Sequence, residues 1–217
     1  MKKILAIMPL MDGHVISHRV LASLAHQEGA DNHPPLADDY SPLQIALMPL
    51  SRPLSEYTEA DYGPLASRRT ILKPRRKGVT ENRNLLARLC GSNRFRDIDY
   101  VLHIDGTTVL EGRRDVYDMS EALNAEPGTA AIGIRVMARP AGAQNAGIPS
   151  FGPERNHVDM ACILIRRSVL IEYIFHNGEH HALCNCRAFF DDMKAKGLTV
   201  RYLDDRIIPE DMYYWPA

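Results

Sequence analysis

Short apolar runs that alternate with helical stripes of apolar residues constrain the fold of this chain more than any other feature. The strand-like runs occupy residues 4–8, 43–50, 99–104, 129–137, 158–166 and 199–203. Segments with apolar residues at helical spacing lie between them, at residues 18–27, 81–90, 116–126, 167–175 and 183–195. The alternation predicts a single α/β domain over residues 1–217, with a central, mostly parallel sheet flanked by helices.

Composition excludes several classes of protein. The 217 residues are 45% hydrophobic, and 26 basic residues face 27 acidic ones, so bulk charge favours neither a nucleic-acid binder nor a membrane-surface protein. The first apolar run resembles a signal peptide but is short and stops at Pro9 and Asp12, which favours a buried strand. No run is long enough for a transmembrane segment. Four cysteines are too few for a disulfide scaffold, so we expect reduced thiols and a cytoplasmic protein.

Two long segments lack a clear period. Residues 51–77 carry prolines and predict an irregular excursion, after which Thr80 is expected to cap the next helix. Residues 138–157 are rich in glycine, proline and alanine. The second segment predicts a mobile loop that closes over a ligand.

Asp105 follows directly after the apolar run of residues 99–104. Ligands of parallel sheets bind at the carboxyl ends of strands, so this carboxylate is a candidate for contact with a metal or a sugar. The simpler interpretation is an ordinary acid in a surface turn. Both interpretations place Asp105 just beyond the end of a strand.

The order of five segments resembles the GT-A nucleotide-sugar glycosyltransferases, in the manner of glycosyltransferase family 2. The resemblance covers about residues 3–205, and its segments are IMPLMDGHVISHRVLASLAHQ, KGVTENRNLLARL, DYVLHIDGTTVL, VDMACILIRRSVL and MKAKGLTVRYLDD. It implies one GT-A-like, Rossmann-like domain. It also implies that Pro9, at the end of the first strand, and the pair Arg83 and Asn84 contact the donor.

The resemblance implies a metal site with an altered motif. Family members carry Asp-x-Asp after the strand, which holds Mg²⁺ or Mn²⁺ on the donor diphosphate, whereas this chain has Asp105, Gly106 and Thr107. Asp105 is therefore the expected metal contact. A hard cation prefers several charged oxygen ligands, so we expect weak affinity, with donor phosphates and water completing the shell.

The resemblance also implies an acidic catalytic base near the last helix, but Asn185 and Cys186 stand at the family's position. A carboxylate is needed because the acceptor hydroxyl must lose a proton as it attacks. Glu179 and Asp191 are the candidates, with Asp192 beside the second.

Arg75 and Arg76 lie in a basic run that would suit a donor diphosphate or a polyanionic acceptor. A solvated surface is the simpler interpretation of this run. The same holds for Arg83 and Asn84, which could be the exposed first turn of a helix.

The predicted function is transfer of a sugar from a nucleotide-diphosphate donor to an acceptor hydroxyl on a glycan, lipid-linked sugar, protein or nucleic acid. The alternative is a catalytically degenerate GT-A domain that binds a nucleotide or a partner without transfer. A nucleotidyltransferase is a weaker candidate, because residues 9–19 lack its glycine-rich, basic signature.

A group of histidines and cysteines raises the separate question of zinc. Its members are His176, His180, His181, Cys184 and Cys186. Zinc prefers such ligands, but the spacing matches no familiar finger, and the two cysteines face apart on a predicted helix.

Overall fold

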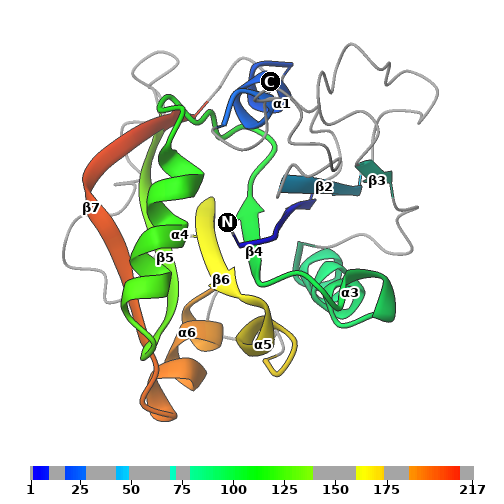
Figure 1. Cartoon of the computed structure of the whole chain (residues 1–217), viewed down its shortest axis with the longest axis vertical. Helices are drawn as coiled ribbons and strands as arrows, with labels where there is room; N and C mark the ends of the chain where they lie inside the picture. Colours follow the sequence, from blue (N-terminus) through cyan, green and yellow to red (C-terminus); the bar gives the residue numbers. More distant parts are fainter. Residues whose placement is uncertain are drawn as a thin grey trace.

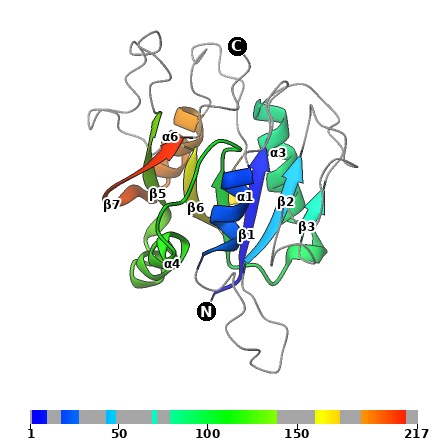
Figure 2. The same cartoon turned by 90° about the horizontal axis from the view of Figure 1, so that it is seen from above.

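The computed structural model describes residues 2–9, 18–27, 43–48, 69–71, 79–138, 160–173 and 186–210. They form one seven-stranded sheet with the strand order β3-β2-β1-β4-β6-β5-β7 (Figure 1). The strands are β1 (Ile4–Pro9), β2 (Leu43–Met48), β3 (Arg69–Ile71), β4 (Tyr100–Ile104), β5 (Thr129–Ala138), β6 (Cys162–Arg166) and β7 (Thr199–Glu210). Figure 2 shows β3 and β7 at opposite margins of the sheet.

The sheet is mostly parallel, as the sequence predicts. β1 pairs in parallel with β2 and β4, β2 with β3, and β5 with β7. β6 is the exception, because it runs antiparallel between β4 and β5. The start of β6 therefore meets the end of β4 at the same edge of the sheet.

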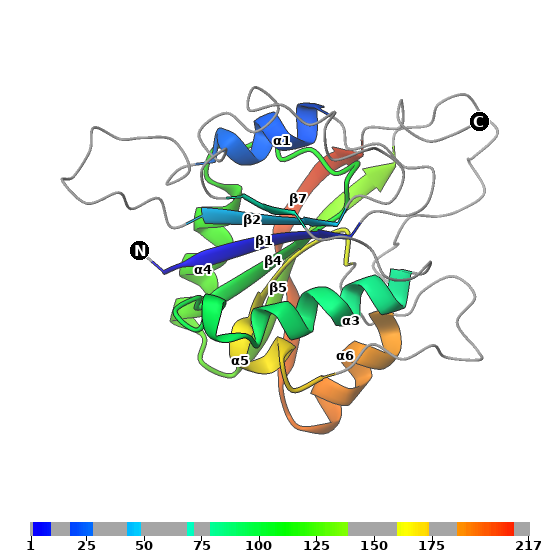
Figure 3. The same ribbon diagram turned by 90° about the vertical axis from the view of Figure 1, so that its right-hand side faces the viewer.

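Helices cover both faces of the sheet (Figure 3). They are α1 (His18–Ala25), α3 (Val79–Cys90), α4 (Asp115–Ala125), α5 (Arg167–Leu170) and α6 (Cys186–Ala195), with a 3₁₀ turn, η3 (Asn93–Phe95). α1 and α4 belong to one hydrophobic cluster, and α3, α5 and α6 belong to a second. This arrangement explains why the central strands are apolar at nearly every position.

Alternation along β4 divides its side chains between the two clusters. Leu102 and Ile104 pack in the cluster of α1 and α4, whereas Val101 packs in that of α3. Successive side chains of a strand point to opposite faces, so His103 lies on the same face as Val101 and points toward α3.

Four expectations from the sequence need correction. β3 lies within the segment expected to be irregular, where three residues pair with β2 at the edge of the sheet and are too few to show a period. α3 begins at Val79, so Thr80 lies in its first turn and is not the cap before it. α5 has only four residues, and β7 continues to Glu210 because its second half pairs with β5 beyond an irregularity in register. In the loop predicted for residues 138–157, Ala138 is the last residue of β5, and the rest lies outside the described residues.

No helix within the described segments has the length and apolar character needed to cross a membrane.

Candidate functional site

Asp105 lies in a tight turn immediately after β4. Its backbone N–H donates to the carbonyl of Ala161 over 3.0 Å, and its own carbonyl accepts from the N–H of Thr108, also over 3.0 Å. The first bond ties the end of β4 to the residue just before β6. The backbone of Asp105 is thereby fixed, while its side chain is 35% exposed.

Arg83 lies opposite Asp105. It comes from the second turn of α3, and one of its terminal nitrogens, Nη2, is 3.8 Å from Oδ1 of Asp105. The arginine side chain is only 10% exposed. The structure therefore brings together two residues that the sequence predicts to contact a donor.

His103 is the third member of this group, and the sequence analysis did not single it out. Its side chain is fully buried, and its Nε2 accepts a hydrogen bond of 3.2 Å from Nε–H of Arg83. Its Nδ1 lies 2.6 Å from the carbonyl oxygen of Met160. Because Nε2 is an acceptor, the proton is on Nδ1, which donates to Met160.

Electrostatics keep this imidazole neutral. Burial is the largest cause that holds the pKa of His103 well below its usual 6.5, and the charge of Arg83 lowers it further. The bond to Met160 acts in the opposite direction but is the smallest of the three influences. A neutral histidine can accept from Arg83, whereas a protonated one cannot.

Two threonines, with their hydroxyl groups, follow Asp105 in the turn. Thr107 and Thr108 are both buried, and Oγ1 of Thr108 finds no hydrogen-bond partner among the described residues. In the part of the chain that the structure describes, no three acidic, histidine or cysteine side chains gather at a metal-binding distance. Within these residues Asp105 offers a single carboxylate, which is fewer charged oxygens than a hard divalent cation prefers.

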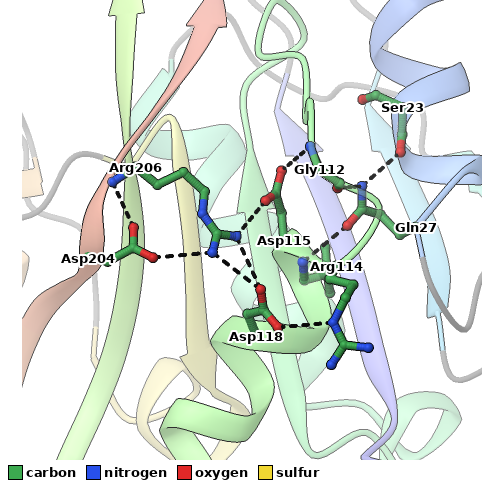
Figure 4. A network of polar contacts seen from close by, with 9 residues as sticks. Ser23, Gln27, Gly112, Arg114, Asp115, Asp118, Asp204 and Arg206 are labelled. Carbon is green, nitrogen blue, oxygen red and sulfur yellow. Dashed lines mark hydrogen bonds and ion pairs between the residues drawn. The ribbon is translucent and has the colours of Figure 1, made fainter.

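The segment that leaves the site is fixed by α1 (Figure 4). Nε2 of Gln27 donates to the carbonyl of Gly112 over 2.8 Å, and its Oε1 accepts from the N–H of Val116 over 3.1 Å. Oγ of Ser23 accepts from the N–H of Leu110 over 3.2 Å. These bonds lock the chain between β4 and α4 into one path.

An ionic cluster at the start of α4 ties that helix to β7 (Figure 4). Asp115 is fully buried and accepts from the N–H of Gly112 over 2.8 Å and from Nη1 of Arg206 over 2.7 Å. Arg206 also donates to Asp118 over 3.3 Å and to Asp204 over 3.2 Å. Hydrogen bonds to Asp115 are the largest cause that raises the pKa of Arg206. Because its charges pair with one another, this cluster is an ion-pair network that links α4 to β7.

The other predicted site residues are only partly placed. Pro9 ends β1 and pairs in register with Met48, and Asn84 follows Arg83 in α3 and is half-buried. Asp191 and Asp192 lie exposed in α6. Glu179, Arg75 and Arg76 lie outside the described residues, as do His176, His180, His181 and Cys184.

Two of the four cysteines have side chains that the structure describes. Cys90 and Cys162 are buried and free. Cys186 opens α6, on the side of the molecule where the second cluster packs.

Comparison with solved structures identifies the fold as GT-A-like. TarS of S. aureus, residues 1–349, matches 97% of this chain with a TM-score of 0.58 and 13% identity, over 58% of its own length. Glucosyl-3-phosphoglycerate synthase of Mycobacterium tuberculosis matches 96% with a TM-score of 0.55 and 15% identity, over 72% of its own length. The chain therefore spans about three fifths of the TarS fragment. No protein-family model and no curated protein sequence matches it significantly.

Proposed function

We propose that this protein transfers a sugar from a nucleotide-diphosphate donor to an acceptor hydroxyl. The observation that carries the proposal is the Arg83–Asp105 pair, at the carboxyl edge of the sheet in a GT-A-like fold. Structures of the similar proteins support it, since TarS has been solved in complex with UDP-GlcNAc. The mycobacterial synthase has been solved with Mn²⁺, UDP-glucose and phosphoglyceric acid.

The proposed chemistry uses these residues to stabilise a leaving group. As the acceptor oxygen bonds to the anomeric carbon, the bond from that carbon to the diphosphate oxygen breaks and the diphosphate gains negative charge. A bound Mg²⁺ or Mn²⁺ would act as a Lewis acid on the phosphate oxygens, and Asp105 would be its protein ligand. Arg83 would place a fixed positive charge near the same oxygens.

Other contacts complete the proposal. Pro9 and Asn84 would line the donor site, and Arg75 and Arg76 would add positive charge toward the diphosphate. Glu179 or Asp191 would take the proton of the acceptor hydroxyl. The acceptor class and the cytoplasmic location stay predictions, as does the single domain over residues 1–217.

A second function is a GT-A domain that binds a nucleotide without transfer. One observation favours it specifically: Thr107, where family members have their second acid, is a buried hydroxyl residue. Asp105 then stands as the one carboxylate of the turn.

Both functions can be tested with a panel of nucleotide sugars and nucleoside diphosphates, with and without Mn²⁺. The shift in melting temperature measures binding, and released nucleoside diphosphate measures turnover. Asp105→Asn keeps the shape and removes the charge, so we expect its rate to fall by about a hundredfold or more. Asp97→Asn is the matched control, because Asp97 is 68% exposed and precedes β4, at the opposite edge of the sheet.

The outcomes separate the two functions. Binding without turnover by the wild-type protein would favour the degenerate domain. An Asp105→Asn variant as active as wild type would reduce Asp105 to a turn residue.

A further inference from the structure

His103 is a polar residue in a place that packing alone would fill with an apolar one. In the sheet register it lies beside Ile7 of β1 and Ile163 of β6, and its side chain is fully buried. Burying an imidazole among aliphatic side chains costs free energy unless its nitrogens find partners. Both nitrogens do so, with Arg83 on one side and Met160 on the other.

The bond to Arg83 controls the direction of the guanidinium group. The group is planar, and a bond at Nε restricts the plane and turns the two terminal nitrogens in a set direction. Here that direction brings Nη2 to 3.8 Å from Asp105. The arginine is 10% exposed, so water cannot replace the imidazole on its buried side.

We propose that His103 is a positioning residue, which holds the Arg83 guanidinium toward Asp105 by accepting its Nε–H. The inference deepens the proposed function and rests on it. It assigns to His103 no contact with the substrate. Its effect reaches the donor diphosphate through the orientation of Arg83.

The rival explanation is a structural tether between His103 and Met160. Two substitutions separate these explanations, because the two ring nitrogens stand at different distances along the side chain. The amide of His103→Gln ends near the position of Nε2 and can still accept from Arg83. The amide of His103→Asn ends near the position of Nδ1 and can still donate to Met160.

The measurements are kcat and KM for nucleotide-sugar turnover, donor affinity by calorimetry, and melting temperature for both variants. We expect kcat/KM of His103→Asn to fall by about tenfold to a hundredfold, the scale for losing a residue that orients a ligand-contacting group. The loss should fall mainly on kcat, because the diphosphate's charge is greatest in the transition state. His103→Gln should recover most of this activity.

The opposite result overturns the proposal. If His103→Asn keeps activity and His103→Gln loses it, the histidine is a tether to Met160. If both variants match wild type in kcat and KM, the orientation of the Arg83 guanidinium group does not depend on His103. If both variants fail to fold, the wild-type protein still decides, because nitrogen-labelled samples should show scalar coupling between Nε of Arg83 and Nε2 of His103.

This coupling also separates failure of the inference from failure of the proposed function. A wild-type protein that neither binds nor turns over any donor contradicts the proposed function, whatever the coupling. Absence of the coupling in a protein that does turn over a donor contradicts the role of His103 alone.

Discussion

Replacement of Arg206 by methionine should destabilise the fold far more than the partial exposure of this arginine suggests. The reason lies with its partner. Asp115 is fully buried, and within the described residues its carboxylate accepts one bond from Gly112 and one from Arg206. Methionine keeps much of the packing volume, so the variant leaves a buried carboxylate without its cation.

The size of the effect follows from the geometry. Removing one partner of a buried ion pair typically costs about 3–5 kcal/mol. Arg206 is 35% exposed, so water can reach part of the vacated space, and we expect the lower end, about 3 kcal/mol. Asp115→Asn should cost less, about 2 kcal/mol, because Gly112 and Arg206 donate to different oxygens of the carboxylate, and the amide NH2 that replaces one of these oxygens cannot accept. Asp118→Asn, at a side chain 31% exposed, should cost less than about 1 kcal/mol.

Urea denaturation followed by circular dichroism measures these free energies of unfolding. The double variant Arg206→Met/Asp115→Asn should cost less than the sum of the two single changes, because no unpaired charge remains buried. If Arg206→Met lost less than about 1 kcal/mol, or the two changes were additive, the cluster would be no more than a surface network.

Three further predictions follow from other parts of the structure. Gly112→Ala should lower the free energy of unfolding by about 1–3 kcal/mol in the same assay, because the added Cβ would lie 2.5 Å from Oδ1 of Asp115; an unchanged value would contradict the close approach. Cys90 should resist alkylation in the native protein and react on unfolding, because burial raises its pKa to about 12; mass spectrometry of the labelled peptide checks this, and rapid native labelling would refute it. His103 should make stability fall below pH 6.5, because its folded pKa lies well below the 6.5 of the unfolded chain, which therefore takes up the proton first. Between those two pKa values the free energy of unfolding should fall with decreasing pH by up to about 1.4 kcal/mol per pH unit. Urea denaturation at a series of pH values in the presence of a chelator should show this fall in wild type and not in His103→Gln. Parallel pH profiles for the two proteins would contradict the prediction.

The sequence predicted the fold well because most of the helices and strands can be recognised from a local pattern of apolar residues. The continuous apolar run of β1 and the helical period of α4 can each be seen within a dozen residues, and their order defines the layers. β3 was missed because three residues show no period and become a strand only by pairing with β2. The start of α3 was misplaced by two residues, since helix ends depend on packing as well as on the cap.

The residues of the candidate site also differ in how much local sequence signal they give. Asp105 stands out because a charge follows an apolar run, and Arg83 was found through the resemblance. His103 gave a weaker signal, a single histidine inside an apolar strand, whose meaning depends on partners 20 and 57 positions away. The pairing of Asp115 with Arg206 spans 91 positions and has no local signal at all.

The reversed direction of β6 has a consequence for how the protein folds. Met160 and Ala161, which hold His103 and Asp105, lie beside the end of β4 only because β6 runs antiparallel to it. Each of these contacts closes a loop of more than fifty residues. Closing such a loop costs chain entropy, and this cost opposes formation of the contact. Asp105 can thus occupy its turn as soon as β4 exists, but it acquires its fixed backbone and oriented arginine only when β4 and β6 pair. The candidate site is therefore complete only after the strands on the β4 side of the sheet have paired with those on the β6 side.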